Sequence, residues 1–178
     1  MITVAMLRGL ASLRAFTDDE LNILLGAASS RVVPAGEVLL REGDPGRSCV
    51  ILARGELEVV KRVGDVDRVI ATMPAGSLLG QVALVDRSPR TATVRARTEV
   101  AVLELDRDVF ERLLSAESPL ALRFQEQIAV AGARQLRNTT EALARILEAT
   151  GATPGLAPVD ALESLRISFD EWGLPVER

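Results

Sequence analysis

The sequence contains no histidine and no tyrosine, and aromatic residues make up only 3% of its 178 positions. Without histidine there is no imidazole to ligate a metal, to act as a general base or to complete a catalytic triad. No paired carboxylates, metal cluster or nucleophile–base pair indicates an active site. The sequence therefore predicts a protein that is not an enzyme and that needs neither metal nor cofactor.

Cysteine is almost as scarce. The one cysteine, Cys49, lies in an apolar run, and with no histidine to activate it we expect a buried, inert thiol. One cysteine permits no disulfide within the chain, which fits a reducing compartment. The cytoplasm is the predicted location.

Long hydrophobic runs are missing too, so no membrane span is expected. Arg8 and Arg14 precede the first acidic residue, as in a transit peptide, but the better-supported alternative is an amphipathic helix. Its inward face would carry Val4, Leu7, Leu10, Ala11 and Leu13. The net charge of −4 gives no indication of a nucleic-acid surface.

The composition that remains, 48% hydrophobic and 26% charged, is typical of one globular domain. A capping box from Thr17 to Glu20 predicts a helix over 18–28, in which the Thr17 hydroxyl and the Glu20 carboxylate cap each other's backbone N–H groups. The residues of this helix expected to face the core are Leu21, Leu24 and Leu25.

Short apolar runs divided by glycine and proline turns follow, and they predict a β-roll or jelly roll. The fold class is thus mainly β with flanking helices. The predicted strands are 31–33, 38–41, 48–53, 56–61, 68–73, 91–97 and 100–105.

Two helices are predicted to follow, a short one after Asp106 and a long one over 119–149 with Ser118 as N-cap and Pro119 at its first position. A four-three spacing in the long helix favours a parallel helix pair, and hence a homodimer. The alternative is a helix that lies on its own β-roll. The residues at this spacing are Ala129, Ala133, Leu136, Thr140, Leu143 and Leu147.

Glycines and prolines after 150 predict a linker, then a short helix over 160–167 and an apolar end of uncertain role. The expected organisation is a domain over 1–150, made of N-terminal helices (1–28), the β-roll (29–105) and C-terminal helices (106–150), with a tail over 151–178.

The segment from Leu78 to Ala96 is predicted to cradle an anion. Gly80 can bend the backbone so that N–H groups approach a ligand, and a helical turn from Gln81 would add unpaired donors. Arg90 offers a fork of donors for two phosphate oxygens, and Thr91 a hydroxyl beside it.

The pattern G-x-x-A-L-x-x-x-x-P-R-x-A-T, which begins at Gly80, resembles the phosphate-binding cassette of cyclic nucleotide-binding domains. That family includes the domains of protein kinase A regulatory subunits and of the bacterial cAMP receptor protein. Gly43, Asp44 and Gly55 also match family turns. One position departs: the family usually has glutamate after the first glycine, where it accepts the ribose 2′-OH, and this chain has Gln81.

The resemblance implies a cAMP or cGMP ligand, with Arg90 on the phosphate and Gln81 on the ribose. Thr91 is similar to cGMP-selective members, whereas a threonine pair in the long helix is similar to the base contacts of the cAMP type, which we slightly favour. The implied ligand-binding residues are Gly80, Gln81, Val82, Ala83, Arg90, Thr91, Thr139 and Thr140.

Two functions from different classes stay open. The first is a sensor that responds to cyclic nucleotide through a homodimer or an unknown protein partner. The second is a degenerate domain that keeps the fold for structure or protein interaction, and Gln81 favours it. Because 151–178 is shorter than a winged helix-turn-helix, we expect a stand-alone domain without DNA binding.

Overall fold

The computed structural model describes residues 2–149. The chain divides between Ala133 and Arg134 into two units. The first unit holds every strand of the described part and the start of helix α5, which continues into the second unit. The predicted linker, the helix over 160–167 and the tail lie outside the described residues.

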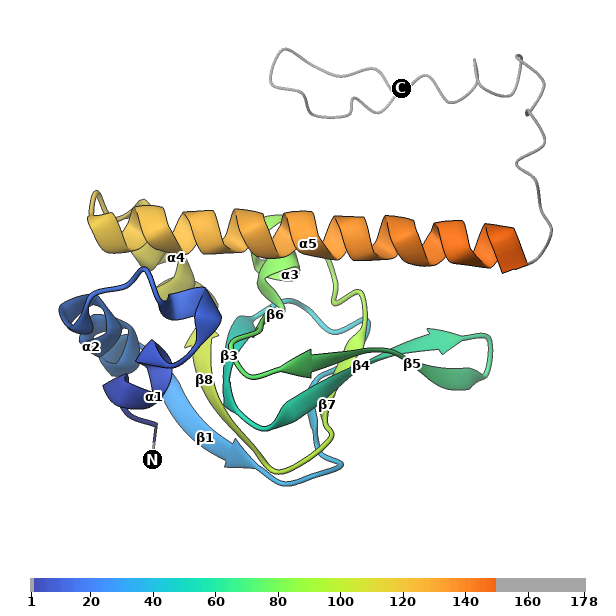
Figure 1. Cartoon of the computed structure of the whole chain (residues 1–178). Helices are drawn as coiled ribbons and strands as arrows, with labels where there is room; N and C mark the ends of the chain where they lie inside the picture. The colour runs from blue at the N-terminus through green and yellow to red at the C-terminus, as the bar shows by residue number, and fades with distance from the viewer. Residues whose placement is uncertain (1, 150–178) are drawn as a thin grey trace, which may run out of the picture. The chain divides into compact units, whose positions relative to one another are not determined.

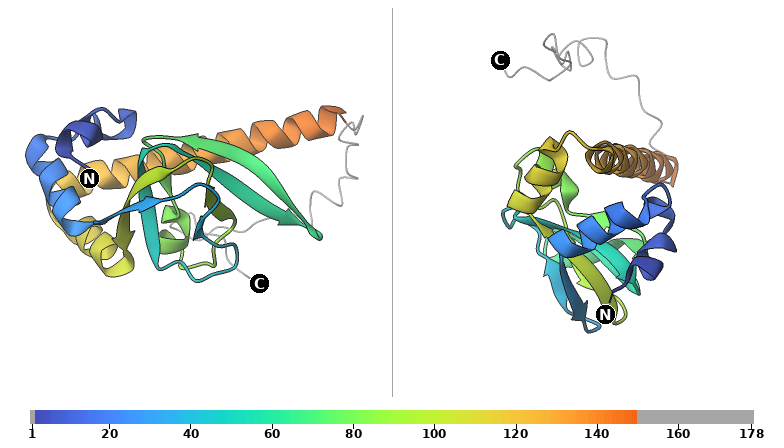
Figure 2. Two further views of the ribbon diagram at one scale, coloured as in Figure 1. Left: turned by 90° about the horizontal axis from the view of Figure 1, so that it is seen from below. Right: turned by 90° about the vertical axis from the view of Figure 1, so that its left-hand side faces the viewer.

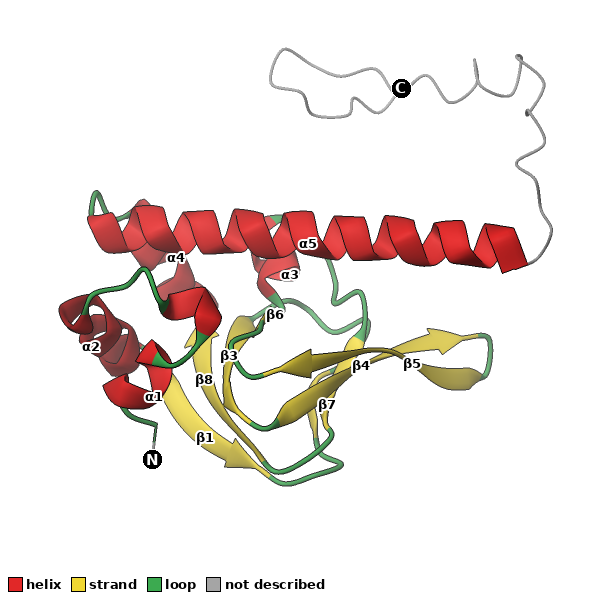
Figure 3. Cartoon of the chain, in the orientation of Figure 1, coloured by secondary structure: helices red, strands yellow, loops and turns green. Residues whose placement is uncertain are grey.

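Two antiparallel four-stranded sheets form a β-roll within residues 2–149 (Figure 3), and the predicted jelly-roll class is confirmed. The strand orders are β1-β8-β3-β6 and β2-β7-β4-β5. The strands are β1 (Ser29–Val33), β2 (Val38–Leu40), β3 (Ser48–Arg54), β4 (Glu56–Val63), β5 (Val66–Pro74), β6 (Leu78–Leu79), β7 (Thr93–Ala96) and β8 (Val100–Asp106).

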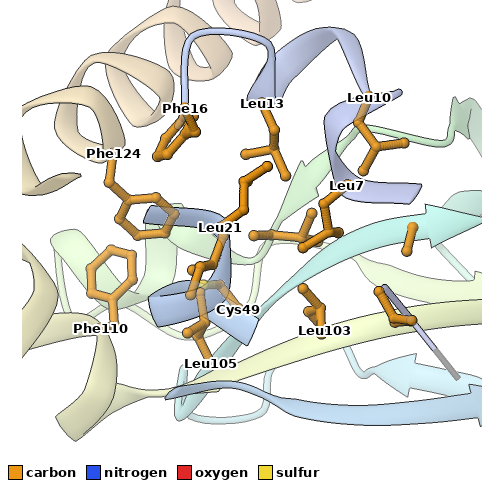
Figure 4. Packing of buried hydrophobic residues seen from close by; sticks show 14 of the residues in the cluster. Leu7, Leu10, Leu13, Phe16, Leu21, Cys49, Leu103, Leu105, Phe110 and Phe124 are labelled. Carbon is orange, nitrogen blue, oxygen red and sulfur yellow. The ribbon is translucent and has the colours of Figure 1, made fainter. Parts of the chain in front are cut away.

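Strands β3 and β8 are apolar on both faces because each separates two cores. On one face, Val50 of β3 and Val102 of β8 pack inside the roll. On the other, Cys49 and Leu103 pack against the helices (Figure 4). Burial raises the pKa of the Cys49 thiol to about 12, as expected for an inert core residue.

Helices α1 and α2 lie beside β1 and β8 (Figure 1), and together with α4, the first turns of α5 and the outer face of β3 and β8 they enclose the larger core. The aromatic rings of Phe110 and Phe124 meet edge-to-face there, with centroids 5.9 Å apart. The helices are α1 (Val4–Arg8), the 3₁₀ helix η1 (Ala11–Leu13), α2 (Asp18–Ala27), α3 (Gln81–Val85), α4 (Arg107–Ser115) and α5 (Pro119–Ala149).

The amphipathic helix expected before residue 14 is present as two short pieces rather than one. Gly9 ends α1, since glycine is a poor helix former, and Leu10 then adopts an extended backbone. Leu7, Leu10 and Leu13 are buried as predicted. The inward placement of Ala11 was wrong, because the break turns this residue outward.

The capping box at α2 is confirmed. The Thr17 hydroxyl accepts a hydrogen bond from the Glu20 amide, and the Glu20 carboxylate accepts one from the Thr17 amide at 2.7 Å. Glu20 is only 8% exposed. The same carboxylate pairs with Arg123 of α5 and so ties the two helices together.

The strand predicted over 91–97 is shorter, because Arg90, directly before it, is bound to the β2–β3 loop. The Arg90 amide donates to the Asp44 carbonyl, and the Arg90 carbonyl accepts from the Gly43 amide, both at 2.9 Å. Strand β7 therefore begins only at Thr93. In contrast, the hairpin of β4 and β5 is longer than predicted, and Figures 1 and 2 show it projecting beyond the neighbouring strands.

Helix α5 has the predicted bounds, and the Ser118 hydroxyl caps it by accepting from the Ala121 amide at 3.2 Å. Its first turns are anchored in the core by Leu120 and Phe124. Leu136 is 69% exposed. The side chains of Leu143 and Leu147 lie outside the described set. No helix in the described part is long and apolar enough to cross a membrane.

Candidate ligand-binding site

Gly80 begins the predicted anion cradle, and the structure gives two reasons why it is glycine. Its φ of +81° lies in the left-handed region. A Cβ there would come within 2.6 Å of Nη1 of Arg90 and 2.8 Å of a methyl carbon of Leu40. The absence of a side chain therefore allows the Arg90 guanidinium to lie directly against the backbone that leads into α3.

The Arg90 side chain is held by two carbonyl groups and is only 6% exposed. Its Nη1 donates to the Gly80 carbonyl at 2.8 Å, and its Nη2 donates to the Ser48 carbonyl at 2.5 Å. Its backbone is fixed as well, through the bonds to Gly43 and Asp44. Arg90 is thus held by three segments, which are the β2–β3 loop, the first residue of β3 and the N-cap of α3.

The charge of Arg90 has no partner in the described residues, because no carboxylate there lies within ion-pair distance of it. Burial lowers the pKa of the guanidinium below its ordinary value, although the Glu104 carboxylate, which lies beyond ion-pair distance, acts in the opposite direction. A buried cation that meets only neutral carbonyls keeps part of its desolvation cost. An anion bound at this point would offset that cost.

Gln81 is the second unusual group, because it is 4% exposed and its side-chain amide makes no hydrogen bond in the described part of the chain. No fully enclosed side-chain polar atom of the described residues lacks a partner. The Gln81 amide therefore keeps access to solvent. It lies at a cleft of about 150 Å³ lined by Gln81, Val82, Val85, Asp86, Ile128 and Gly132.

The other predicted cassette residues lie on or beside α3. Ala83 is buried and packs directly on Gly46, where a Cβ would come within 2.6 Å of it. Val82 is 36% exposed. Thr91 is exposed, and its carbonyl accepts a hydrogen bond from Nζ of Lys61 at 2.7 Å. The structure thus brings the six predicted residues from Gly80 to Thr91 into one local site.

The two predicted base contacts belong to the second unit. The Thr140 side chain is exposed, and its hydroxyl donates to the Leu136 carbonyl at 2.9 Å, one turn back along α5. The side chain of Thr139 lies outside the described set. Their contact with a purine stays a prediction.

Two groups at the site were missed by sequence reasoning. The Ser48 carbonyl binds Arg90, but a backbone group leaves no signal in the sequence. Arg107 donates to carbonyls of α3. One signal could have identified it, since a cation at the first position of a helix opposes the helix dipole and so indicates some other role.

A larger hollow of about 480 Å³ lies where α4 turns into α5. Its lining comes from residues between Leu114 and Gln125 and is mostly apolar. None of the buried polar residues Glu20, Ser48, Gln81 and Arg90 lines it. In addition, no group of three or more potential metal ligands occurs in the described residues. Three of these four buried polar residues, Ser48, Gln81 and Arg90, lie at the cassette.

A β-roll with flanking helices, a glycine-bounded helical turn and a buried arginine defines the class of cyclic nucleotide-binding folds. The family model described as "Cyclic nucleotide-binding domain" matches residues 30–117. These residues belong to the cyclic nucleotide-binding domain family, and the predicted family is confirmed.

Three similar proteins illustrate the relationship. A cAMP-dependent protein kinase regulatory subunit of Emericella nidulans is 44% identical over 81 residues, which cover 46% of this chain and 19% of that protein. A cyclic nucleotide-binding domain from Methylobacillus flagellatus superposes with a TM-score of 0.68 at 25% identity, covering 82% of this chain and 80% of that one.

The third is the regulatory domain of Toxoplasma gondii PKA in a co-crystal structure with cAMP, with a TM-score of 0.54 and 30% identity over 61% of this chain and 42% of that chain. The curated relatives are much longer than the region they share with this chain, which spans between 19% and 28% of their length in the first two.

Proposed function

We propose that this chain is a regulatory domain that senses a cyclic nucleotide, with the ligand phosphate bound at Arg90. The state of Arg90 carries the proposal, because the guanidinium is buried and has neutral partners only among the described residues. A guanidinium has five N–H donors, and two carbonyls accept from it here. Donors therefore remain for a singly charged phosphodiester, which would supply the missing negative charge.

The unpaired amide of Gln81 supports a ligand with a polar group beside its phosphate. In the family pattern this position faces the ribose, and an amide oxygen can accept a hydrogen bond from a 2′-OH. Because the residue is largely buried and its amide still reaches solvent without a protein partner, a polar group of the ligand could replace water there.

We take cAMP as the first candidate ligand. Of the three relatives named above, one is a cAMP-dependent protein kinase regulatory subunit and one was crystallised with cAMP. An exposed threonine follows the cassette arginine, and its hydroxyl could reach a guanine amino group, so cGMP is the competing ligand. A direct comparison of the two nucleotides decides between them.

The output of the sensor is proposed to be an interaction with protein, either a second copy or a separate partner. The names of the curated relatives describe subunits of a kinase. The exposed Leu136 at a seam position of α5 supports pairing with a second copy. The proposed location is the cytoplasm.

The competing function is a fold retained for structure or interaction without nucleotide. Gln81 favours it, because a neutral amide accepts the ribose bond with about half the strength of a carboxylate. Calorimetric titration of the whole chain with cAMP, cGMP and, as a control, ring-opened 5′-AMP separates the two functions. A sensor binds a cyclic nucleotide more tightly than 5′-AMP. When the free nucleotide concentration is about 100 times its Kd, the protein gains about 2.7 kcal/mol of stability. If neither cyclic nucleotide binds at millimolar concentration, the sensor proposal fails and the competing function is favoured.

A further inference from the structure

The side chain of Arg107 binds three backbone carbonyls at once. Its Nη1 donates to the Leu84 carbonyl at 3.2 Å, and its Nη2 donates to the Ala83 carbonyl at 3.2 Å and to the Gly46 carbonyl. The first two carbonyls belong to α3, and the third belongs to the β2–β3 loop. One guanidinium thus joins the cassette helix to the loop on which it packs.

Helix α3 depends on such contacts because it has only five residues. An isolated helix of this length is not stable in water, since nucleation costs more than its few hydrogen bonds return. The last carbonyls of any helix also lack N–H partners within it. The Asp86 amide donates to the Val82 carbonyl at 3.0 Å, and Arg107 serves the next two carbonyls along the chain.

The place of Arg107 in its own helix is not explained by the stability of that helix. It is the first residue of α4, where the helix dipole disfavours a positive charge. Its own amide donates to the Arg47 carbonyl at 2.8 Å, so backbone and side chain both hold the β2–β3 loop. The residue is explained by what it does for α3.

A weaker second link runs parallel to the first. The Glu111 carboxylate lies 3.5 Å from Nη1 of Arg107 and 3.8 Å from Nη2 of Arg87, which follows α3 in the cassette loop. Both ion pairs are long, and the side chains of Glu111 and Arg87 are 48% and 79% exposed, so they contribute little. The carbonyl contacts of Arg107 are therefore the main connection.

We propose that Arg107 is a positioning residue for the ligand site: it caps α3 and holds the cassette in its binding-competent place from the start of α4. The part that concerns the ligand rests on the proposed function. Without the cap, α3 is in place for only a fraction of the time. The apparent Kd then rises by the inverse of that fraction, while the rate at which bound ligand leaves stays close to that of the wild type.

Two substitutions separate the cap from the charge. Arg107→Gln removes both, whereas Arg107→Lys keeps a cation but loses the planar fork that reaches three carbonyls. Glu111→Gln is the matched control, since it removes the ion pair and leaves the carbonyl contacts intact. NMR measurement of amide hydrogen exchange in the nucleotide-free protein tests the cap at Asp86, whose amide bonds to the Val82 carbonyl at the end of α3. The exchange rate of Leu103 in β8 serves as the reference for the core.

We expect the Asp86 amide to exchange about tenfold faster in both Arg107 variants, since hydrogen bonds from a charged donor are strong enough for such a change. The exchange rate of the Leu103 amide should not change. Glu111→Gln should match the wild type at both amides. With cAMP as the probe, association slows about tenfold and dissociation does not change. Unchanged Asp86 exchange, or equally faster exchange at Leu103, would overturn the proposal. If the wild type binds no cyclic nucleotide, the proposed function fails while the exchange data still test the cap.

Discussion

The guanidinium of Arg90 donates a hydrogen bond to the carbonyl of Gly80 at 2.8 Å, although the two residues stand ten positions apart in the cassette. This contact closes the cassette into a loop around α3. It requires glycine at one end, because a Cβ on residue 80 would occupy the position of the arginine. Gly80 and Arg90, two residues of the family pattern, therefore form one structural unit.

The first prediction tests this unit through Gly80→Ala. The new methyl group meets Arg90 and Leu40, and the residue also adopts a strained φ. The control is Gly36→Ala, because Gly36 has a φ of +88° and nothing within 4 Å of its Cβ position. Strain alone costs about 1–2 kcal/mol in both variants, and overpacking adds about 1–3 kcal/mol in Gly80→Ala only. Urea unfolding measures the difference, and equal losses in the two variants would contradict the close packing.

The second prediction concerns Arg90→Ala. Loss of the charge-assisted hydrogen bonds should weaken cyclic nucleotide binding by about 1.5–3 kcal/mol, which is one to two decades in Kd. Arg87→Ala is the control, since Arg87 lies in the same loop and its side chain is 79% exposed. Calorimetric titration checks both variants. Wild-type affinity in Arg90→Ala would show that the phosphate binds elsewhere.

The third prediction concerns the departure from the family pattern. Gln81→Glu should tighten binding of the preferred nucleotide about fivefold, since a carboxylate accepts the ribose 2′-OH with charge assistance, worth about 1 kcal/mol. Binding of the 2′-deoxy nucleotide should stay nearly unchanged, because it has no hydroxyl at that position. If both nucleotides bind Gln81→Glu no better than the wild type, position 81 does not contact the ribose.

The fourth prediction concerns assembly. Leu136→Glu should convert the proposed dimer into a folded monomer, because an unpaired charge buried in the seam costs more than the apolar contact that it replaces. Leu122→Glu is the matched control, with a leucine on the same helix that is 68% exposed where Leu136 is 69% exposed. Light scattering at tens of micromolar reads the mass. A monomeric wild type would end the dimer proposal.

The fifth prediction concerns pH. The backbone hydrogen bond from Thr17 holds the pKa of Glu20 below its ordinary value, and Arg123 contributes in the same direction. Since the folded pKa is depressed, the stabilisation is present above the unfolded pKa of about 4.3 and is lost as the pH falls through the folded pKa. The melting temperature of the wild type should therefore fall more steeply with decreasing pH than that of Glu20→Gln. Parallel plots of melting temperature against pH for the two proteins would mean that Glu20 contributes nothing to the pH dependence of stability.

Local signals along the sequence determined much of this protein. The capping box at Thr17, the N-cap at Ser118 and the bounds of α5 were predicted, since each depends on residues within a turn or two of one another. Alternating apolar residues separated by turns likewise predicted most strands. The cassette pattern indicated the family, because its glycine and arginine stand at a fixed spacing that the fold requires.

Only the tertiary structure decided how the site is held. The Ser48 carbonyl that binds Arg90 lies 42 residues earlier in the chain, and the Arg107 side chain that caps α3 comes from a helix that begins after the roll has closed. The backbone hydrogen bonds of Arg90 with Gly43 and Asp44 likewise explain why β7 starts at Thr93 rather than at 91. The periodicity of a local sequence does not predict such tertiary contacts, because they form only when distant segments pack together. The burial of Gln81 and the missing carboxylate partner of Arg90 within the described residues emerge from that packing, and they support the proposal that the cassette binds an anion.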